Sequence, residues 1–271
     1  MADKPSAPSS ASIGREAGEF DGVVFDMDGV VTRTAAVHSL AWKRMFDEFL
    51  RARTTDRGEP FREFTHEHDY RSYVDGRPRY QGVATFLASR GIELPMGTSD
   101  DSPSAETVCG LGNRKNAYFN RILEMEGVGV YDSTVALIRD LQAGGIAVGL
   151  ATSSRNSAQV LERSGTAELF ATVVDGIVSE LLGLKGKPHP DIFLTAARNL
   201  GVAPGRAIVV EDAVSGVQAA ARGGFGLVIG LARENNESEL RHNGANLVVR
   251  DLAETSLEEI NRLVRAQRAG V

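Results

Sequence analysis

Two acidic residues stand directly after an apolar stretch near the start of the chain. Residues 22–25 read Gly-Val-Val-Phe, and Asp26, Met27, Asp28 and Gly29 follow at once. Residues i and i+2 of an extended chain project to the same side, so Asp26 and Asp28 can point together beyond the end of a strand. Two carboxylates this close repel each other unless a cation or a shared proton separates them. The pair therefore predicts a ligand site.

Three later segments place polar groups at the ends of strands or before a helix. They supply hydroxyl groups, a lysine and two more acids: Thr152, Ser153 and Ser154; Lys187; Glu211 and Asp212. Acids with only oxygen ligands suit a hard cation such as Mg²⁺, and a hydroxyl and a lysine beside a metal suit a phosphoryl group. Asp26 can then act as a nucleophile that forms an aspartyl phosphate, while Asp28 passes a proton to the leaving oxygen.

The elements that must position these groups alternate between strands and helices. Apolar strands are expected at residues 22–25, 146–152, 172–174, 207–210, 226–229 and 247–249, and helices at 131–143, 156–164, 190–200, 214–222 and the carboxyl end. Continuous apolar strands that alternate with helices indicate an α/β fold with a parallel sheet covered on both faces. In such sheets the ligand binds beyond the carboxyl ends of the strands, where these polar groups lie.

The segment between the first two strands has a different character. Residues 35–127 are polar and aromatic, have helical periodicity with Pro and Gly breaks, and contain no strong run typical of a buried strand. We expect a helical cap domain there, inserted into an α/β core formed by residues 20–34 and 128–271. Residues 1–19 are rich in Ser, Ala and Pro and are predicted to form a disordered tail.

Composition excludes several classes of function. The 271 residues carry a net charge of −6, which argues against non-specific binding of nucleic acid. No run reaches the roughly 20 apolar residues of a membrane span, and residues 1–19 lack the hydrophobic segment expected of a signal peptide. The single cysteine, Cys109, cannot form a disulfide within the chain and is expected to be a packed thiol. The protein is predicted to be cytoplasmic and to be a monomer or a homodimer.

One further run has the composition of a metal cluster. His66, Glu67, His68 and Asp69 are consecutive. The two histidines are two residues apart and so do not share a helix face. A solvated segment is therefore the favoured interpretation.

The four motifs together resemble those of the haloacid dehalogenase superfamily. The resemblance rests on Asp26-x-Asp28-Gly29-Val30, the strand end at Thr152, Lys187-Pro188-x-Pro190-Asp191 and Glu211-Asp212-x-x-x-Gly216. It covers the chain from about residue 20 and again from about 130 to 230, and it implies a Rossmann-like core with an inserted helical cap. Lys185 is a second candidate for the phosphate-binding cation, but the Lys-Pro-x-Pro spacing favours Lys187.

A closer resemblance is to the β-phosphoglucomutase subfamily. It rests on residues 29–32, 34–35, 114–116 and 151–156, together with His38, Trp42 and Arg79. The resemblance implies that Mg²⁺ is held by Asp26, the backbone carbonyl of Asp28, Glu211 and Asp212, and that Thr152 and Lys187 hold the transferring phosphoryl group. Residues that would meet the sugar or its distant phosphate are His38, Arg79, Lys115, Ser154 and Asn156. Two departures are Arg33 and Ala36, which replace acids usual in the subfamily.

These residues predict a Mg²⁺-dependent enzyme of carbohydrate metabolism that acts on a small phosphorylated sugar. The favoured reaction is that of a β-phosphoglucomutase, an isomerase that converts β-glucose 1-phosphate into glucose 6-phosphate. A sugar-phosphate phosphatase, a hydrolase, is the alternative, because it would use nearly the same core. A non-catalytic binding module is a minor alternative, since no motif residue is lost.

Overall fold

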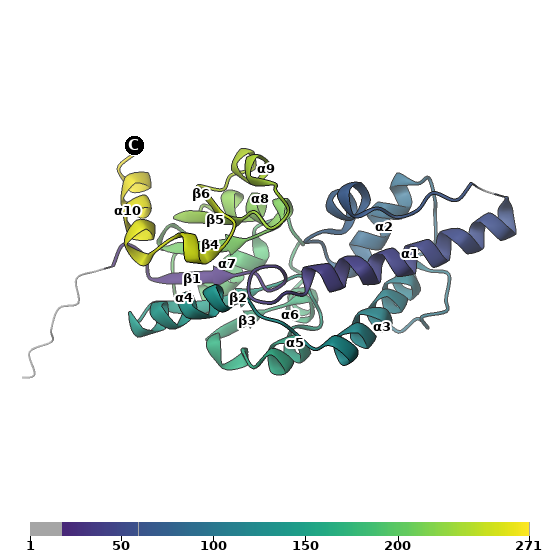
Figure 1. The fold of residues 1–271 in the computed structure, drawn as a ribbon, viewed down its shortest axis with the longest axis horizontal. Coiled ribbons are helices and arrows are strands. Elements are labelled where there is room, and N and C mark those ends of the chain that lie inside the picture. Colours follow the sequence, from purple (N-terminus) through teal and green to yellow (C-terminus); the bar gives the residue numbers. More distant parts are fainter. Residues whose placement is uncertain (1–17, 59, 271) are drawn as a thin grey trace, which may run out of the picture.

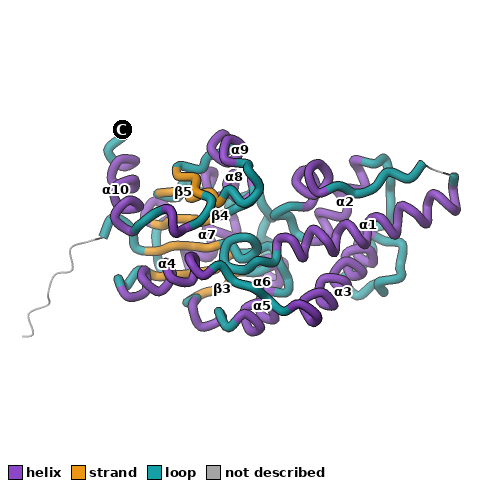
Figure 2. Tube along the Cα trace, in the orientation of Figure 1, coloured by secondary structure: helices purple, strands orange, loops and turns teal. Residues whose placement is uncertain are grey.

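The chain folds into two lobes of different composition. A computed structural model describes residues 18–58 and 60–270. One lobe contains the whole sheet with helices around it, and the other is built from α1, α2 and α3 and their connections (Figure 1). Figure 2 shows strands in the first lobe only. The predicted α/β fold with an inserted helical cap is confirmed.

The sheet has six parallel strands in the order β3-β2-β1-β4-β5-β6. Their bounds are β1 Gly22–Phe25, β2 Ala147–Ala151, β3 Thr172–Val174, β4 Ala207–Glu211, β5 Leu227–Leu231 and β6 Leu247–Val249. Val24 of β1 is aligned with Gly149 of β2 on one side and with Val209 of β4 on the other. The carboxyl ends of β1, β2 and β4 therefore lie next to one another, and segments far apart in sequence meet there.

Side chains of β1 alternate between two apolar layers. Val23 and Phe25 belong to a cluster with residues of α4, α5 and α10, while Val24 belongs to a cluster with residues of α7, α8 and α9. Helices thus cover both faces of the sheet, as its apolar strands require. The bounds are α4 Asp132–Ala143, α5 Ser157–Ser164, α6 Gly176–Leu181, α7 Asp191–Asn199, α8 Val214–Arg222, α9 Glu237–His242 and α10 Leu257–Arg268.

The cap has an aromatic core of its own. It consists of α1 (Ala35–Arg57), the π-helical segment η1 (His66–Val74), α2 (Arg79–Ser89) and α3 (Val108–Glu126). The ring of Phe46 lies 4.1 Å from that of Phe86 and 5.1 Å from that of Phe64. Cys109, at the start of α3, is buried and is a free thiol, as expected.

The structure also differs from the sequence-based expectations in detail. The short helices α6 and α9 were not predicted. Residues 1–17 of the predicted tail lie outside the described residues, but Glu19 accepts a 2.6 Å hydrogen bond from Arg265 of α10. In the described part of the chain, no helix combines the length and apolar character needed to cross a membrane.

Candidate active site

A buried lysine joins the first and fourth motifs at the edge of the sheet. Lys187 Nζ donates to Asp26 Oδ1 at 2.5 Å and to Glu211 Oε1 at 2.6 Å. Asp26 directly follows β1, Glu211 ends β4, and Lys187 precedes α7. The competing candidate, Lys185, is exposed on the same loop, so Lys187 is the lysine of the pair that contacts these acids.

The spacing between Glu211 and Gly216 has a steric cause. Glu211 Oε2 accepts a 2.6 Å hydrogen bond from the backbone N–H of Ala213. A Cβ atom at Gly216 would lie 1.7 Å from Glu211 Oε1, so only glycine lets α8 pass this close to the carboxylate. Both oxygens of Glu211 therefore have protein partners. Each carboxylate oxygen can accept more than one contact, so direct ligation of a metal by Glu211 stays a prediction.

Asp212 approaches the turn that follows Asp26. Gly29 has a φ of +82°, which favours glycine, and a Cβ atom there would lie 1.8 Å from Asp212 Oδ2. The glycine thus serves both the turn and the carboxylate. Asp212 lines the same pocket as Asp26 and Asp28.

Asp28 contacts both the first linker between core and cap, at Thr34, and the cap itself, at His38. It accepts a hydrogen bond from Thr34 Oγ1. His38 Nε2 of α1 lies 3.3 Å from Asp28 Oδ1, and the other ring nitrogen, Nδ1, lies 2.5 Å from Lys115 Nζ of α3. Burial by itself raises the pKa of Asp28, but His38, Thr34 and Lys115 outweigh it, so the pKa lies below its ordinary value.

The loop after β2 lies opposite these acids. Thr152 is buried, and its hydroxyl accepts a 3.1 Å hydrogen bond from the N–H of Ser154. Ser153 Oγ donates at 2.9 Å to the carbonyl of Gly76, which belongs to the cap. The predicted phosphate-binding residues Thr152, Ser153 and Lys187 all line one pocket with Asp26.

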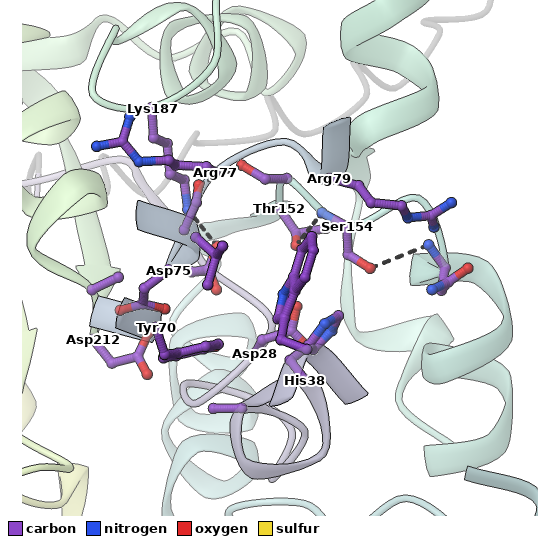
Figure 3. Close-up of a pocket in the computed structure, with 18 of the residues that line it drawn as sticks. Asp28, His38, Tyr70, Asp75, Arg77, Arg79, Thr152, Ser154, Lys187 and Asp212 are labelled. Carbon is purple, nitrogen blue, oxygen red and sulfur yellow. Dashed lines mark hydrogen bonds and ion pairs between the residues drawn. The ribbon is translucent and has the colours of Figure 1, made fainter. Parts of the chain in front are cut away.

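The cap closes the far end of this pocket with cationic and amide side chains. Asn116 Oδ1 accepts hydrogen bonds from Arg79 at 2.8 Å and from Asn156 of the core at 2.7 Å. In Figure 3 Lys187 and Arg79 lie on different sides of Thr152. All five predicted substrate-contacting residues line the pocket: His38, Arg79, Lys115, Ser154 and Asn156.

One end of the pocket has an excess of acid. Burial raises the pKa of Asp26 to about 8, although Lys187 opposes the shift, and Glu211 and Asp28 add to it. Burial followed by repulsion from Glu211 also raises the pKa of Asp212 well above its ordinary value. Lys187 is the one lysine or arginine whose side chain is paired with these acids in the described residues. A bound cation would relieve this repulsion.

The opposite end has an excess of positive charge. Burial and the nearby guanidinium of Arg79 lower the pKa of Lys115 well below its ordinary value. Burial likewise lowers the pKa of Arg79, and burial together with Lys115 lowers that of His38. An anionic ligand group at this end would stabilise the charged forms of these residues.

The donor set fits a magnesium ion that shares its coordination with a ligand. Among the described residues, no three His, Cys, Asp or Glu side chains are clustered so as to hold a metal by themselves. Mg²⁺ commonly binds through one or two carboxylates and completes its shell with water and substrate phosphate. The carboxylates of Asp26 and Asp212, in a pocket rich in acid, provide such a pair.

Among the pocket residues that were not predicted as site residues, four carry a charged group or a phenol. Tyr70, Asp75 and Arg77 come from η1 and the loop after it, and Arg155 follows Ser154. Burial and the nearby Glu211 raise the pKa of Asp75 to about 7. A solitary acid in a polar insert carries no spacing signal, so only the docking of the cap on the core identifies it. For Arg155, its place within the motif at residues 151–156 was the available signal.

The structure also places one departure from the subfamily pattern and revises one sequence-based interpretation. Arg33 does not line the pocket; its Nε donates at 2.9 Å to the carbonyl of Val130, in the second linker between core and cap. The run at His66–Asp69 is not uniformly solvated, because Asp69 is buried and lies 2.9 Å from Arg90 Nη2. Trp42 is packed in the cap core and also lines the pocket.

These motifs, the parallel sheet and the inserted cap define the class of the protein. A family model described as haloacid dehalogenase-like hydrolase matches residues 20–224. The chain belongs to this family of enzymes, as the resemblance predicted.

Two relatives and one solved structure show which members of the family the chain is similar to. The chain is 44% identical to a β-phosphoglucomutase of Mycobacterium bovis over 234 residues, which are 85% of this chain and 89% of the relative. It is 26% identical to a phosphorylated carbohydrates phosphatase of Thermotoga maritima over 221 residues, 81% of this chain and 88% of the relative. The fold matches the crystal structure of a β-phosphoglucomutase from Clostridium difficile with a TM-score of 0.70 at 24% identity, covering 92% of this chain and 99% of the other.

Proposed function

We propose that the protein transfers a phosphoryl group on a sugar phosphate through Asp26, and that it converts β-glucose 1-phosphate into glucose 6-phosphate. The observation that carries the proposal is the division of one pocket into an acidic end and a cationic end. The acidic end suits a metal and the reacting phosphoryl group, and the cationic end suits a second phosphate. A substrate or intermediate with two phosphates would occupy both ends, which a mutase requires.

The reaction proceeds in two half-reactions, transfer of the phosphoryl group to Asp26 and transfer from Asp26 to a sugar hydroxyl. A carboxylate oxygen of Asp26 attacks the phosphorus atom, the bond from phosphorus to the donor oxygen breaks, and Asp28 gives that oxygen a proton. In the second half a sugar hydroxyl attacks the phosphorus atom, the bond to Asp26 breaks, and Asp28 takes the hydroxyl proton. Lys187 and the hydroxyl of Thr152 stabilise the charge on the phosphoryl oxygens.

Asp26, Glu211, Asp212 and the backbone carbonyl of Asp28 would hold Mg²⁺. When bound, the metal supplies positive charge that favours the carboxylate form of Asp26 and neutralises charge on the phosphoryl oxygens. Glu211 meanwhile holds Lys187 in place through its 2.6 Å contact.

The cap residues would bind the remainder of the substrate. Arg79 and Lys115 provide charge for the distant phosphate, and Asn156 is already oriented by Asn116. His38 lies between Lys115 and Asp28, so it can keep the acid in place while it contacts the sugar. Closing the cap excludes water from the reacting phosphoryl group.

A sugar-phosphate phosphatase is the second candidate, supported by the phosphatase relative of Thermotoga maritima. Product analysis separates the two functions. The purified protein would be incubated with Mg²⁺, β-glucose 1-phosphate and a trace of the 1,6-bisphosphate. Glucose 6-phosphate that forms faster than free phosphate supports the mutase, whereas free phosphate alone from many sugar phosphates refutes it.

A further inference from the structure

A group of charged side chains joins the cap to the core outside the catalytic pocket. His66 Nε2 of η1 lies 2.6 Å from Glu234 Oε1, in the segment between β5 and α9. Arg71 of η1 forms an ion pair with Glu239 of α9, and its Nε lies 3.8 Å from Glu234 Oε2. We call His66, Arg71, Glu234 and Glu239 the latch. Its partners are 163 to 168 residues apart, so it forms only when cap and core meet.

The latch lies beside the catalytic pocket and not in it. Arg71, Glu234 and Glu239 line a smaller cavity whose wall also includes Tyr70, Asp75 and Asp212. The last three residues line the catalytic pocket as well, and Figure 3 shows them together on one side of it. The latch therefore lies behind this wall of the pocket, and its side chains can be changed without removing a pocket residue.

The core side of the latch is fixed to the loop that carries the nucleophile. Arg233, next to Glu234, donates from Nε to the carbonyl of Gly29 at 3.0 Å. Its guanidinium also lies 3.7 Å from the ring centre of Tyr131, in the second linker to the cap. The segment that carries Glu234 is thus anchored to both the loop after Asp26 and the second linker between core and cap.

The cap side of the latch is also positioned by neighbouring contacts. Ser39 Oγ of α1 lies 2.6 Å from His66 Nδ1. If the hydroxyl donates this bond, the neutral ring carries its proton on Nε2 and donates it to Glu234, so the contact does not require a charged histidine. Directly after η1, Ser215 Oγ of the core donates to the carbonyl of Asp75 at 3.2 Å.

We propose that the latch keeps the cap closed while Asp26 carries the phosphoryl group, and so determines whether a sugar hydroxyl or water receives that group. This inference rests on the proposed function. With the cap closed, a sugar hydroxyl attacks the phosphorus atom, the bond to Asp26 breaks and Asp28 takes the hydroxyl proton. With the cap open, water attacks the same atom, the same bond breaks, Asp28 takes a proton from water, and inorganic phosphate leaves.

The exposure of the latch suits this role. Between 31% and 48% of each latch side chain is exposed. Exposed ion pairs are individually weak and are screened by salt. The latch can therefore favour closure and still release, as product exchange requires.

The test compares the double variant Glu234→Gln/Glu239→Gln with a matched control, Glu237→Gln. Glu237 also lies in α9, but its carboxylate pairs with Arg250, within the core, at 2.7 Å. With Mg²⁺ and β-glucose 1-phosphate, the ratio of inorganic phosphate to glucose 6-phosphate is measured. We expect it to rise about 2- to 10-fold in the double variant, as the loss of two or three exposed ion contacts permits, and to stay at the wild-type value in the control.

A second readout does not depend on activity. Trp42 is the only tryptophan, is 4% exposed and lines the pocket between cap and core. Its fluorescence should be quenched more strongly by acrylamide in the double variant than in wild type or in Glu237→Gln. The charge-exchanged variant Arg71→Glu/Glu239→Arg should be quenched less than Arg71→Glu alone.

The two readouts separate failure of the latch from failure of the proposed function. Unchanged quenching in the double variant overturns the latch, and so does increased quenching with an unchanged product ratio. If the wild type makes free phosphate and no glucose 6-phosphate, the mutase proposal fails, and with it the role of the latch in selecting the acceptor. Quenching then still shows whether the four residues hold the cap closed.

Discussion

Replacing Lys187 by methionine tests how the site is held together. Lys187 is 1% exposed, and its ammonium group contacts the carboxylates of Asp26 and Glu211. Methionine keeps the length of the side chain and removes the charge. Two buried acids then lie together without a cation, which is strongly unfavourable in a low-dielectric interior.

The magnitude follows from the state of the two acids. Loss of one partner of a buried ion pair costs about 3–5 kcal/mol. Burial and the neighbouring acids raise the pKa of Asp26, so this carboxyl can relieve part of the repulsion by taking up a proton once Lys187 is lost. We therefore expect the metal-free variant to lose about 3 kcal/mol of unfolding free energy, the lower end of that range.

Urea denaturation followed by circular dichroism measures the effect, with Lys185→Met as the control. Lys185 is exposed two residues away, so its variant should stay within about 0.5 kcal/mol of wild type. The phosphoryl-transfer rate of Lys187→Met should also fall by about 10²–10³-fold, because a charge that stabilises the phosphoryl oxygens is lost. Equal stability of the two methionine variants would refute the argument from burial and charge.

Three further predictions concern other parts of the molecule. Burial lowers the pKa of Lys115 well below 10.5, so the side chain loses its charge as the pH rises toward that value. KM for the sugar phosphate should therefore increase with rising pH in wild type but stay nearly constant in Lys115→Arg, and parallel profiles would contradict this. The added methyl group of Gly216→Ala would displace the carboxylate of Glu211, so kcat should fall by about 10²-fold while the circular dichroism spectrum is retained. An unchanged kcat would show that the close approach of α8 to Glu211 is not needed for activity. Arg90→Met leaves buried Asp69 without its cation and should destabilise the cap by about 3–5 kcal/mol, seen as a lower melting temperature; an unchanged melting curve would count against it.

The core of the site could be predicted because a parallel sheet makes local signals converge. Asp26, Thr152 and Glu211 each mark the end of an apolar strand, and β1, β2 and β4 are neighbours. Lys187 was identified by its spacing to two prolines. These signals depend on short segments of sequence and on one general property of α/β folds.

What could not be predicted depends on contacts between distant segments. Asp75 and Arg77 join the pocket only because the loop after η1 docks on the core. The helix α6 has six residues and is held by the Asp175 side chain, which accepts from two backbone N–H groups. So short a helix has too weak a periodic pattern to recognise. The hydrogen-bond donors to Glu211 could not be predicted either, because the sequence shows the acid but not which groups donate to its oxygens.

The central claim is that Asp26 carries the phosphoryl group, and trapping the phosphoenzyme tests it most directly. The protein would be mixed with Mg²⁺ and a sugar phosphate, quenched in acid during turnover, digested and analysed by mass spectrometry. We expect a phosphorylated peptide with the modification on Asp26, and neither modification nor turnover in Asp26→Asn. Turnover by Asp26→Asn, or a phosphoryl group on another residue, would contradict it.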